Sequence, residues 1–153
     1  MHRVSIFLLL VLICFSCTKK DKIVDVKNLN NAWNKNQKLV FKFNSEDAQK
    51  AKNIIFVVRN NNNYPYSNLR LIVNFESPTK KIKTDTLNYI LAKPDGEWIG
   101  TGFGETKEIL FQYKLNYNFA EKGLYKINVT QAMRRNILPG LEDFGIKIES
   151  AKP

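Results

Sequence analysis

The sequence predicts an all-β fold, an antiparallel β-sandwich of jelly-roll or immunoglobulin-like topology with about seven to eight strands. Apolar and polar residues alternate in several segments, as they do in strands that bury one face. Clusters of Asn, Pro and Gly separate these segments, and patterns with a helical period are nearly absent. With 153 residues, of which 44% are hydrophobic and 12% aromatic, the chain can bury one core but not several, and it is too apolar for a disordered protein.

Residues 1–16 have the layout of a bacterial signal peptide. After a basic start, residues 4–15 are uncharged, and the small Ser16 stands directly before Cys17. The uncharged run is shorter than the roughly 20 apolar residues that a membrane-spanning helix needs. A small residue followed by cysteine resembles the lipobox of bacterial lipoproteins, in which the signal is cleaved and the cysteine is acylated, although Cys14 stands where the lipobox usually has Leu or Val.

We therefore expect Cys17 to be the first residue of the mature chain and to hold it on the membrane through acyl chains such as palmitate. Thr18 follows it, and a residue other than Asp at this position favours the outer membrane in the Gram-negative sorting rule. Lipoproteins that Bacteroidetes export to the cell surface often carry acidic residues after the cysteine, whereas this chain continues with Lys19 and Lys20. The sequence thus predicts an outer-membrane lipoprotein on the periplasmic face.

Three parts are predicted along the chain: the signal peptide over 1–16, the lipidated cysteine with a tether over 17–37, and a single β-sandwich domain over 38–153. The tether is rich in Lys and Asn and has few apolar positions. Trp33 is its one large aromatic residue, and we expect it to dock onto the domain.

Seven segments of the domain have the pattern of strands: 39–43, 53–59, 69–75, 82–91, 109–119, 124–130 and 144–149. The longest places the apolar residues from Ile109 to Phe119 on one face. Turn residues lie between the segments, for example at 60–65, 94–96 and 122–123. Short helical turns are predicted after Ser45 and Thr130, which are good N-cap residues.

The residue types that most often carry catalysis or bind transition metals are missing from the expected mature chain, apart from the lipidated cysteine. The sole histidine is His2, and the only cysteines are Cys14 and Cys17. The sequence therefore predicts that the protein is not an enzyme, has no metal or other cofactor and no small-molecule substrate, and forms no disulfide inside the domain.

The stretch DGEWIGTGFGE over 95–105 has glycines at 100, 102 and 104. A phosphate-binding loop is disfavoured, because the Lys-Ser/Thr pair, the GxGxxG spacing and a following amphipathic helix are all missing. We interpret the stretch as a tight loop that passes close to another backbone, with Trp98 packing beside it. The acids Asp95, Glu97, Glu105 and Glu108 leave a hydrolase with paired carboxylates as a minor alternative to solvated turn residues.

Basic residues exceed acidic ones. Removal of the signal takes away one charged residue, Arg3, and leaves 23 basic against 14 acidic residues, a net charge of +9. The expected compartment argues against nucleic acid as the partner of Lys80, Lys81 and Lys83 or of the pair Arg134-Arg135. Anionic lipid headgroups, an acidic protein partner, or plain solvation of a Lys-rich surface remain open.

The segment Tyr64-Pro65-Tyr66-Ser67-Asn68-Leu69, which follows Arg59-Asn60, resembles the signature of the GldH gliding-motility lipoproteins of Bacteroidetes. Further pieces agree in the same order: Asp85-Thr86, then Gly96-Glu97-Trp98-Ile99-Gly100-Thr101-Gly102, then Gln131-Ala132-Met133-Arg134 leading to Phe144-Gly145-Ile146. The resemblance spans nearly the whole mature chain. It implies a lipoprotein of the gliding machinery linked to type IX secretion, with other proteins of that apparatus as partners and with no reaction.

Two sequence segments are candidates for partner contact. Tyr64, Pro65 and Tyr66 form a tip with large amphipathic rings, and Arg134 and Arg135 form a basic pair. Each segment has a structural alternative, in which the tyrosines pack against the sandwich edge and Met133 packs inward. A different class of function is a carbohydrate-binding lipoprotein on a β-sandwich, which would use Trp98 and the tyrosines as a flat stacking platform.

Overall fold

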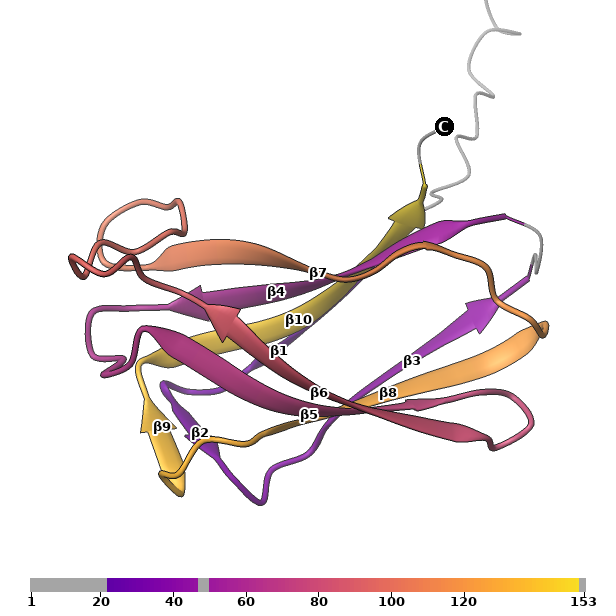
Figure 1. Ribbon diagram of the computed structural model, residues 1–153, viewed down its shortest axis with the longest axis horizontal. Coiled ribbons are helices and arrows are strands. Elements are labelled where there is room, and N and C mark those ends of the chain that lie inside the picture. The colour runs from indigo at the N-terminus through magenta and orange to yellow at the C-terminus, as the bar shows by residue number, and fades with distance from the viewer. Residues whose placement is uncertain (1–21, 47–49, 152–153) are drawn as a thin grey trace, which may run out of the picture.

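A computed structural model describes residues 22–46 and 50–151, which contain ten strands and no helix, and therefore no helix able to cross a membrane (Figure 1). The strands are β1 (Lys22–Asn28), β2 (Ala32–Asn34), β3 (Leu39–Ser45), β4 (Lys52–Asn60), β5 (Asn68–Glu76), β6 (Ile82–Ile90), β7 (Lys107–Tyr117), β8 (Gly123–Gln131), β9 (Ile137–Pro139) and β10 (Leu141–Ser150). The predicted signal peptide and Cys17 lie outside the described residues.

Eight of the strands form two antiparallel four-stranded sheets packed face to face, in the orders β1-β10-β4-β7 and β3-β8-β5-β6. Without the short β2 and β9, the first of the eight strands pairs with the last, the second with the seventh, the third with the sixth and the fourth with the fifth. This is a long antiparallel hairpin rolled into two sheets, the jelly roll. The predicted β-sandwich is confirmed, and of its two topologies the jelly roll is the one observed.

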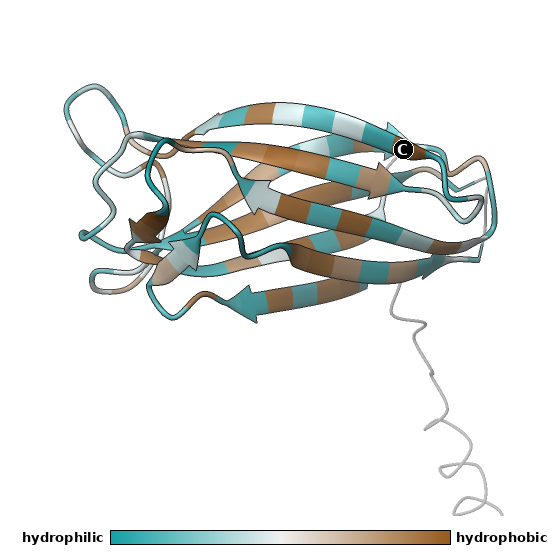
Figure 2. Cartoon of the chain, turned by 90° about the horizontal axis from the view of Figure 1, so that it is seen from below, coloured by the Kyte–Doolittle hydropathy of each residue, from teal (hydrophilic) through white to brown (hydrophobic). Residues whose placement is uncertain are grey.

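The core lies between the sheets and follows the alternation in the sequence, which appears as brown and teal bands along the strands in Figure 2. Along β3, for example, Leu39, Phe41 and Phe43 are buried while the residues between them are exposed. Phe144 lies at the centre, with its ring centroid 5.3 Å from those of Trp33 and Phe56. All seven segments predicted as strands are strands in the structure.

The predicted tether needs a correction, because two strands lie within 17–37. In β1, Asp25 and Lys27 stand opposite Ile146 and Phe144 of the core face of β10, so their side chains point inward at the edge of the sheet. Inward charges on an edge strand discourage pairing with other chains, and they also conceal the alternation that would have revealed the strand. The domain therefore begins by Lys22 rather than at residue 38. Trp33 docks as expected and is fully buried.

The other differences have local causes. The strands β2 and β9 have three residues each, too few for a periodic pattern to identify. The predicted helical turn at 130–135 is wrong, because Thr130 lies in β8 and bends follow it. In β7 the predicted alternation ends after Tyr113, where the register against β4 shifts. Beyond the shift Lys114 points inward, with 14% of its side chain exposed, and Leu115 points outward.

Lys114 belongs to a polar cluster that joins the edge strands of the two sheets. Its Nζ lies 3.3 Å from Asp85 Oδ2 on β6, and the Tyr113 hydroxyl donates to the same oxygen at 2.8 Å. Burial raises the pKa of Asp85, but the hydrogen bond from Tyr113 and the charge of Lys114 outweigh it, and the pKa is below its ordinary value. The carboxylate thus holds β6 and β7 together in its charged form.

This arrangement predicts that the Asp85→Asn variant is less stable than the wild type near neutral pH. A depressed carboxyl pKa contributes stability that is present above the unfolded pKa of about 3.9 and is lost as the pH falls through the folded pKa. We therefore expect the difference in the free energy of unfolding to shrink between neutral pH and about pH 3. Urea denaturation at both pH values measures it, and an equal difference at both would show that the charge of Asp85 is not involved.

The two ends of the sandwich carry different loops (Figure 1). The Lys22 end contains the start of β1, the end of β10, the β5–β6 turn over 77–81 and the β7–β8 loop over 118–122. The Tyr66 end, opposite along the long axis, contains the loops over 61–67, 91–106 and 132–136. The strand registers fix this assignment, because Lys22 lies opposite Glu149 and Asn28 lies opposite Asp143.

Candidate functional site

The predicted tyrosine tip is the loop between β4 and β5 at the Tyr66 end. Asn61 shapes its first turn, since its Oδ1 accepts from the backbone N–H of Asn63 at 3.0 Å and its carbonyl accepts from that of Tyr64 at 3.1 Å. Its Nδ2 donates to Asn31 and Glu142, both at 2.9 Å, which ties the loop to neighbouring segments. Asn61 therefore caps the local backbone and fixes the first turn of the loop.

Tyr64 is part of the core, as in the structural alternative in which the tyrosines pack against the sandwich edge. Only 3% of it is exposed, and its hydroxyl donates to the carbonyl of Asn68 at 2.8 Å. Burial raises the pKa of this hydroxyl well above its ordinary value. Pro65 is exposed and Tyr66 is half-buried, so these two residues are the part of the tip that another molecule can reach.

A groove of about 450 Å³ lies beside Tyr66. Its lining brings together the two segments that the sequence singled out, and consists of Tyr66, Asn68, Arg70, Ala132, Met133 and Arg134. Met133 is buried, and its sulfur accepts from the backbone N–H of Arg70 at 3.3 Å, so it joins β5 to the loop after β8. Arg70 and Arg134 are both exposed. Arg135 is exposed as well but is not among the lining residues.

The loop that carries Arg134 is held by the buried amide of Gln131, which is 2% exposed. Its Nε2 donates to the carbonyls of Arg135 at 3.0 Å and Asn136 at 3.3 Å, and its Oε1 accepts from the N–H of Met133 at 2.9 Å. One side chain thus satisfies three backbone groups and sets the course of the loop. This explains the place of Gln131 in the segment that resembles the family signature.

Replacing Gln131 by Leu is expected to lower the free energy of unfolding by about 2–3 kcal/mol, because buried backbone groups then lose their partners. Thermal or urea denaturation measures this change. The Gln131→Glu variant is a useful comparison, since it keeps the acceptor for Met133 but loses the amide donors. A Leu variant as stable as the wild type would mean that water satisfies these groups instead.

The groove has the chemistry of a cationic recognition site. No carboxylate is among its lining residues, and neither Arg70 nor Arg134 has an ion-pair partner within the described residues. Guanidinium groups bind carboxylates in bidentate geometry and also stack on aromatic rings. With Tyr66 and Met133 also in its lining, the arrangement suits an acidic peptide segment that carries an apolar or aromatic side chain.

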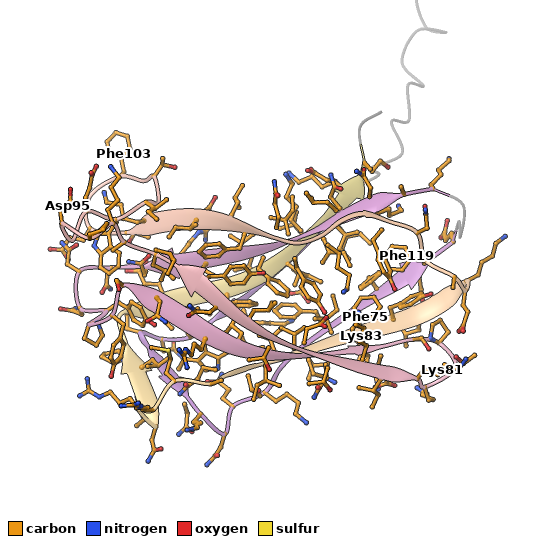
Figure 3. All side chains as sticks on the ribbon, in the orientation of Figure 1. Phe75, Lys81, Lys83, Asp95, Phe103 and Phe119 are labelled. Atoms are coloured by element: carbon orange, nitrogen blue, oxygen red, sulfur yellow. The ribbon has the colours of Figure 1, made fainter. Side chains whose placement is uncertain are left out.

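The glycine-rich stretch forms a loop at the same end, as the interpretation of a tight loop predicted. A Cβ at Gly102 would lie 2.2 Å from the carbonyl oxygen of Thr106, so only glycine permits this close approach. Trp98 packs beside the loop and donates from Nε1 to Asn62 Oδ1 at 3.0 Å. Phe103, which no sequence pattern marks, is fully exposed at the tip of this loop (Figure 3).

Three of the four acids of this region are held by structural contacts. Glu108 forms an ion pair with Arg59 at 2.8 Å, which Asp143 shares at 3.1 Å, and Glu97 is paired with Lys93. Asp95 Oδ1 accepts from the backbone N–H of Glu97 and so caps the turn. Within the described residues no group of three or more His, Cys, Asp or Glu side chains is placed to hold a metal ion.

The aromatic side chains at this end do not make a flat platform. Tyr64 is buried, its ring plane lies at 72° to that of Tyr66, and Trp98 is tilted by 41° against Tyr64. A sugar-binding surface of the kind proposed as the alternative needs coplanar exposed rings, and these three residues do not provide them. Asn68 and Arg70 complete the groove instead, and the sequence pattern did not mark them because they look like ordinary polar positions of a strand.

Comparison with known proteins agrees with the resemblance. The family described as GldH lipoprotein matches residues 22–148. A protein of Christiangramia forsetii named gliding motility lipoprotein GldH homolog is 39% identical over 155 residues, which cover 97% of this chain and 95% of that protein. The gliding motility lipoprotein GldH of Flavobacterium johnsoniae is 39% identical over 152 residues, which cover 95% of this chain and 94% of the relative. Among solved structures, the VP2 subviral particle of infectious bursal disease virus aligns with a TM-score of 0.40 and 10% identity over 85% of this chain and 32% of the viral chain.

Proposed function

The chain belongs to the GldH lipoprotein family, and on that premise we propose that it is an outer-membrane lipoprotein that serves gliding motility and the linked type IX secretion system by protein contact. In this proposal acylated Cys17 holds the domain on the periplasmic face. The groove between Tyr66, Arg70 and Arg134 binds an acidic segment of another protein of the apparatus. The protein acts as an accessory or scaffold component and catalyses no reaction.

The observation that carries the contact role is the position and chemistry of the groove. It lies at the Tyr66 end, at the opposite end of the domain from Lys22, where the strand that follows the expected anchor begins. Two arginines without ion-pair partners in the described part of the chain, next to an aromatic ring, are a common composition for the centre of a protein interface. The relatives are named gliding motility lipoproteins, which supports a role in gliding motility. Glu97 and Glu108 are held in ion pairs, which supports a role without catalysis.

Replacing Cys17 by Ser in the native host tests the anchor. We expect the wild-type protein in the outer-membrane fraction, protected from protease added to whole cells, and the variant in the soluble periplasmic fraction once the membranes are washed with high salt, which releases proteins held only by charge. Loss of membrane attachment should reduce surface spreading and type IX secretion together, because the domain is no longer concentrated where its partners lie. An unanchored variant with full spreading and secretion would overturn the proposed lipoprotein function.

A further inference from the structure

The Lys22 end carries a second recessed site, of different character from the groove at the Tyr66 end. A pocket of about 300 Å³ opens between the β5–β6 turn and the β7–β8 loop. Its apolar part includes the rings of Phe75, Tyr117 and Tyr125, and Lys81, Ile82 and Lys83 lie at its β6 side. In Figure 3, Phe75, Lys81 and Lys83 lie together at this end. Ile82 is 62% exposed between the two lysines.

The acidic groups around this pocket are already engaged. Glu76 is paired with Lys80 at 3.1 Å and with Lys126 at 3.3 Å. Glu121, which lines the pocket, accepts from the hydroxyl and the backbone N–H of Thr79. No carboxylate of the described residues lies within ion-pair distance of Lys81 or Lys83. These two ammonium groups are therefore available to an anion from outside.

The register places the cations directly on the apolar part of the pocket. Lys83 lies opposite Phe75 in the β5–β6 pair, so its stem runs beside the aromatic rings while its charge reaches the rim. Lys114 lies behind the rings, with its Nζ 5.5 Å from the Tyr117 ring centroid and 5.7 Å from that of Phe75, but its charge is already paired with Asp85. An apolar pocket with cations at its mouth matches a ligand that has an anionic head and an apolar tail.

The short segment between Cys17 and β1 indicates that a membrane lipid is the ligand of this kind that lies close to the pocket. Four residues separate Cys17 from Lys22. Whatever their conformation, they allow at most about 18 Å between the two Cα atoms, since an extended chain spans at most 3.6 Å per residue. If Cys17 is acylated, the Lys22 end must therefore face the membrane closely. The β1 start and the pocket lie at opposite corners of this end, because β1 and β6 are edge strands on opposite sides of the sandwich.

We propose that the pocket of Phe75, Lys81, Ile82, Lys83, Tyr117 and Tyr125 binds an anionic phospholipid of the membrane that anchors the protein. The lysines contact the phosphate and the aromatic rings contact the upper part of an acyl chain, while Ile82, which lies opposite Glu76 on the other face of β6 from Lys83, contacts the surrounding lipid. This inference rests on the lipid anchor of the proposed function. Acyl chains at one corner of the Lys22 end and a bound lipid at the other keep the long axis of the sandwich roughly perpendicular to the membrane. The groove with Tyr66, Arg70 and Arg134 then points away from the membrane.

Vesicle flotation of the mature chain with Cys17→Ser tests the pocket without any help from the anchor. The probes are vesicles of phosphatidylcholine alone and vesicles in which part of the lipid is phosphatidylglycerol. We expect binding to the second kind only. The Lys81→Glu/Lys83→Glu variant should bind at least about 30-fold more weakly, because each lysine contributes on the order of a fivefold change in affinity near an anionic surface. Lys38→Glu/Lys42→Glu, which changes the net charge equally away from the pocket, is the matched control.

Ile82→Ser is a second test of the same site, since the side chain is exposed and its loss should not affect folding. The Ile82→Ser change should weaken binding to anionic vesicles. Inorganic phosphate at the same ionic strength should not displace the Cys17→Ser parent chain from these vesicles. Equal losses of vesicle binding in the Lys81→Glu/Lys83→Glu and Lys38→Glu/Lys42→Glu variants would mean that only net charge matters, which would overturn the proposal. Absence of binding by the Cys17→Ser chain itself would also overturn it. Displacement by phosphate would point to a site for soluble anions, and binding to an acidic protein instead of vesicles would point to a protein interface.

The failure of this inference is distinguishable from that of the proposed function. A chain with intact Cys17 and the Lys81→Glu/Lys83→Glu change should still fractionate with the membrane, because the acyl chains suffice for attachment. If only the vesicle experiment fails, the anchor and the partner groove stand. If the Cys17→Ser variant stays with the membrane through the high-salt wash while the vesicle experiment succeeds, the anchor fails and the pocket can still bind lipid.

Discussion

Replacing Phe144 by Ala is expected to lower the free energy of unfolding by about 3–5 kcal/mol, the cost of removing a large aromatic side chain from a packed core. Phe144 is fully buried, and its ring centroid lies 5.3 Å from that of Trp33, 6.1 Å from that of Phe41 and 5.3 Å from that of Phe56. It thus connects β10 with β2, β3 and β4. The cavity left by the change would remove contacts with both sheets at once.

Urea denaturation of the mature chain with Cys17→Ser measures the loss, and Phe103→Ala is the matched control. Phe103 is fully exposed, so the control should change the free energy of unfolding by less than about 0.5 kcal/mol. A loss below about 1 kcal/mol for Phe144→Ala would mean that the core closes around the missing ring, contrary to the dense packing inferred for this position.

Gly140→Ala is expected to be the most damaging small substitution, with a loss of about 2–5 kcal/mol. The residue has φ +75°, a conformation that costs an L-residue about 1–2 kcal/mol. The added Cβ would also lie 2.2 Å from the backbone nitrogen of Tyr64. Because that atom belongs to the backbone, relief requires the whole tyrosine tip to move, and overpacking of this kind typically costs a further 1–3 kcal/mol.

Gly96→Ala separates the two contributions, since Gly96 has φ +89° but nothing within 4 Å of the added Cβ. This control should show only the conformational cost. Gly140→Ala should additionally displace the Tyr64–Tyr66 tip and alter the fluorescence of Trp98, whose ring centroid lies 6.4 Å from that of Tyr64. Equal losses of stability in the two variants would contradict a tight contact between Gly140 and the tip.

The strands that the sequence revealed contain runs of apolar residues at inward positions, such as Leu39, Phe41 and Phe43 in β3. Those that it missed lack such runs for physical reasons. In β1 the inward positions hold Asp25 and Lys27, which protect an edge, and β2 and β9 are too short for a period to appear. The inward turn of Lys114 was not predictable from alternation either, because it depends on a register shift against β4.

For the candidate site, the sequence identified the segments but not how they meet. Tyr66 and Arg134 lie 68 positions apart in the chain, and the jelly-roll topology brings them to one groove. A tyrosine beside a proline can face either way, so the sequence left both roles of Tyr64 open, and the burial of its ring follows from packing near Trp98 and against the Tyr66 ring. Asn68 and Arg70 carry no signal in a single sequence, since polar residues are ordinary on the outer face of a strand.

The central claim is that the chain works by binding another protein through the groove at the Tyr66 end. The most direct test is the Arg70→Glu/Arg134→Glu variant in the native host, with Lys38→Glu/Lys42→Glu as the control of equal charge change. Both variants should reach the membrane like the wild type, and only the groove variant should lose surface spreading and type IX secretion. Full spreading and secretion in a membrane-attached Arg70→Glu/Arg134→Glu variant would contradict the account.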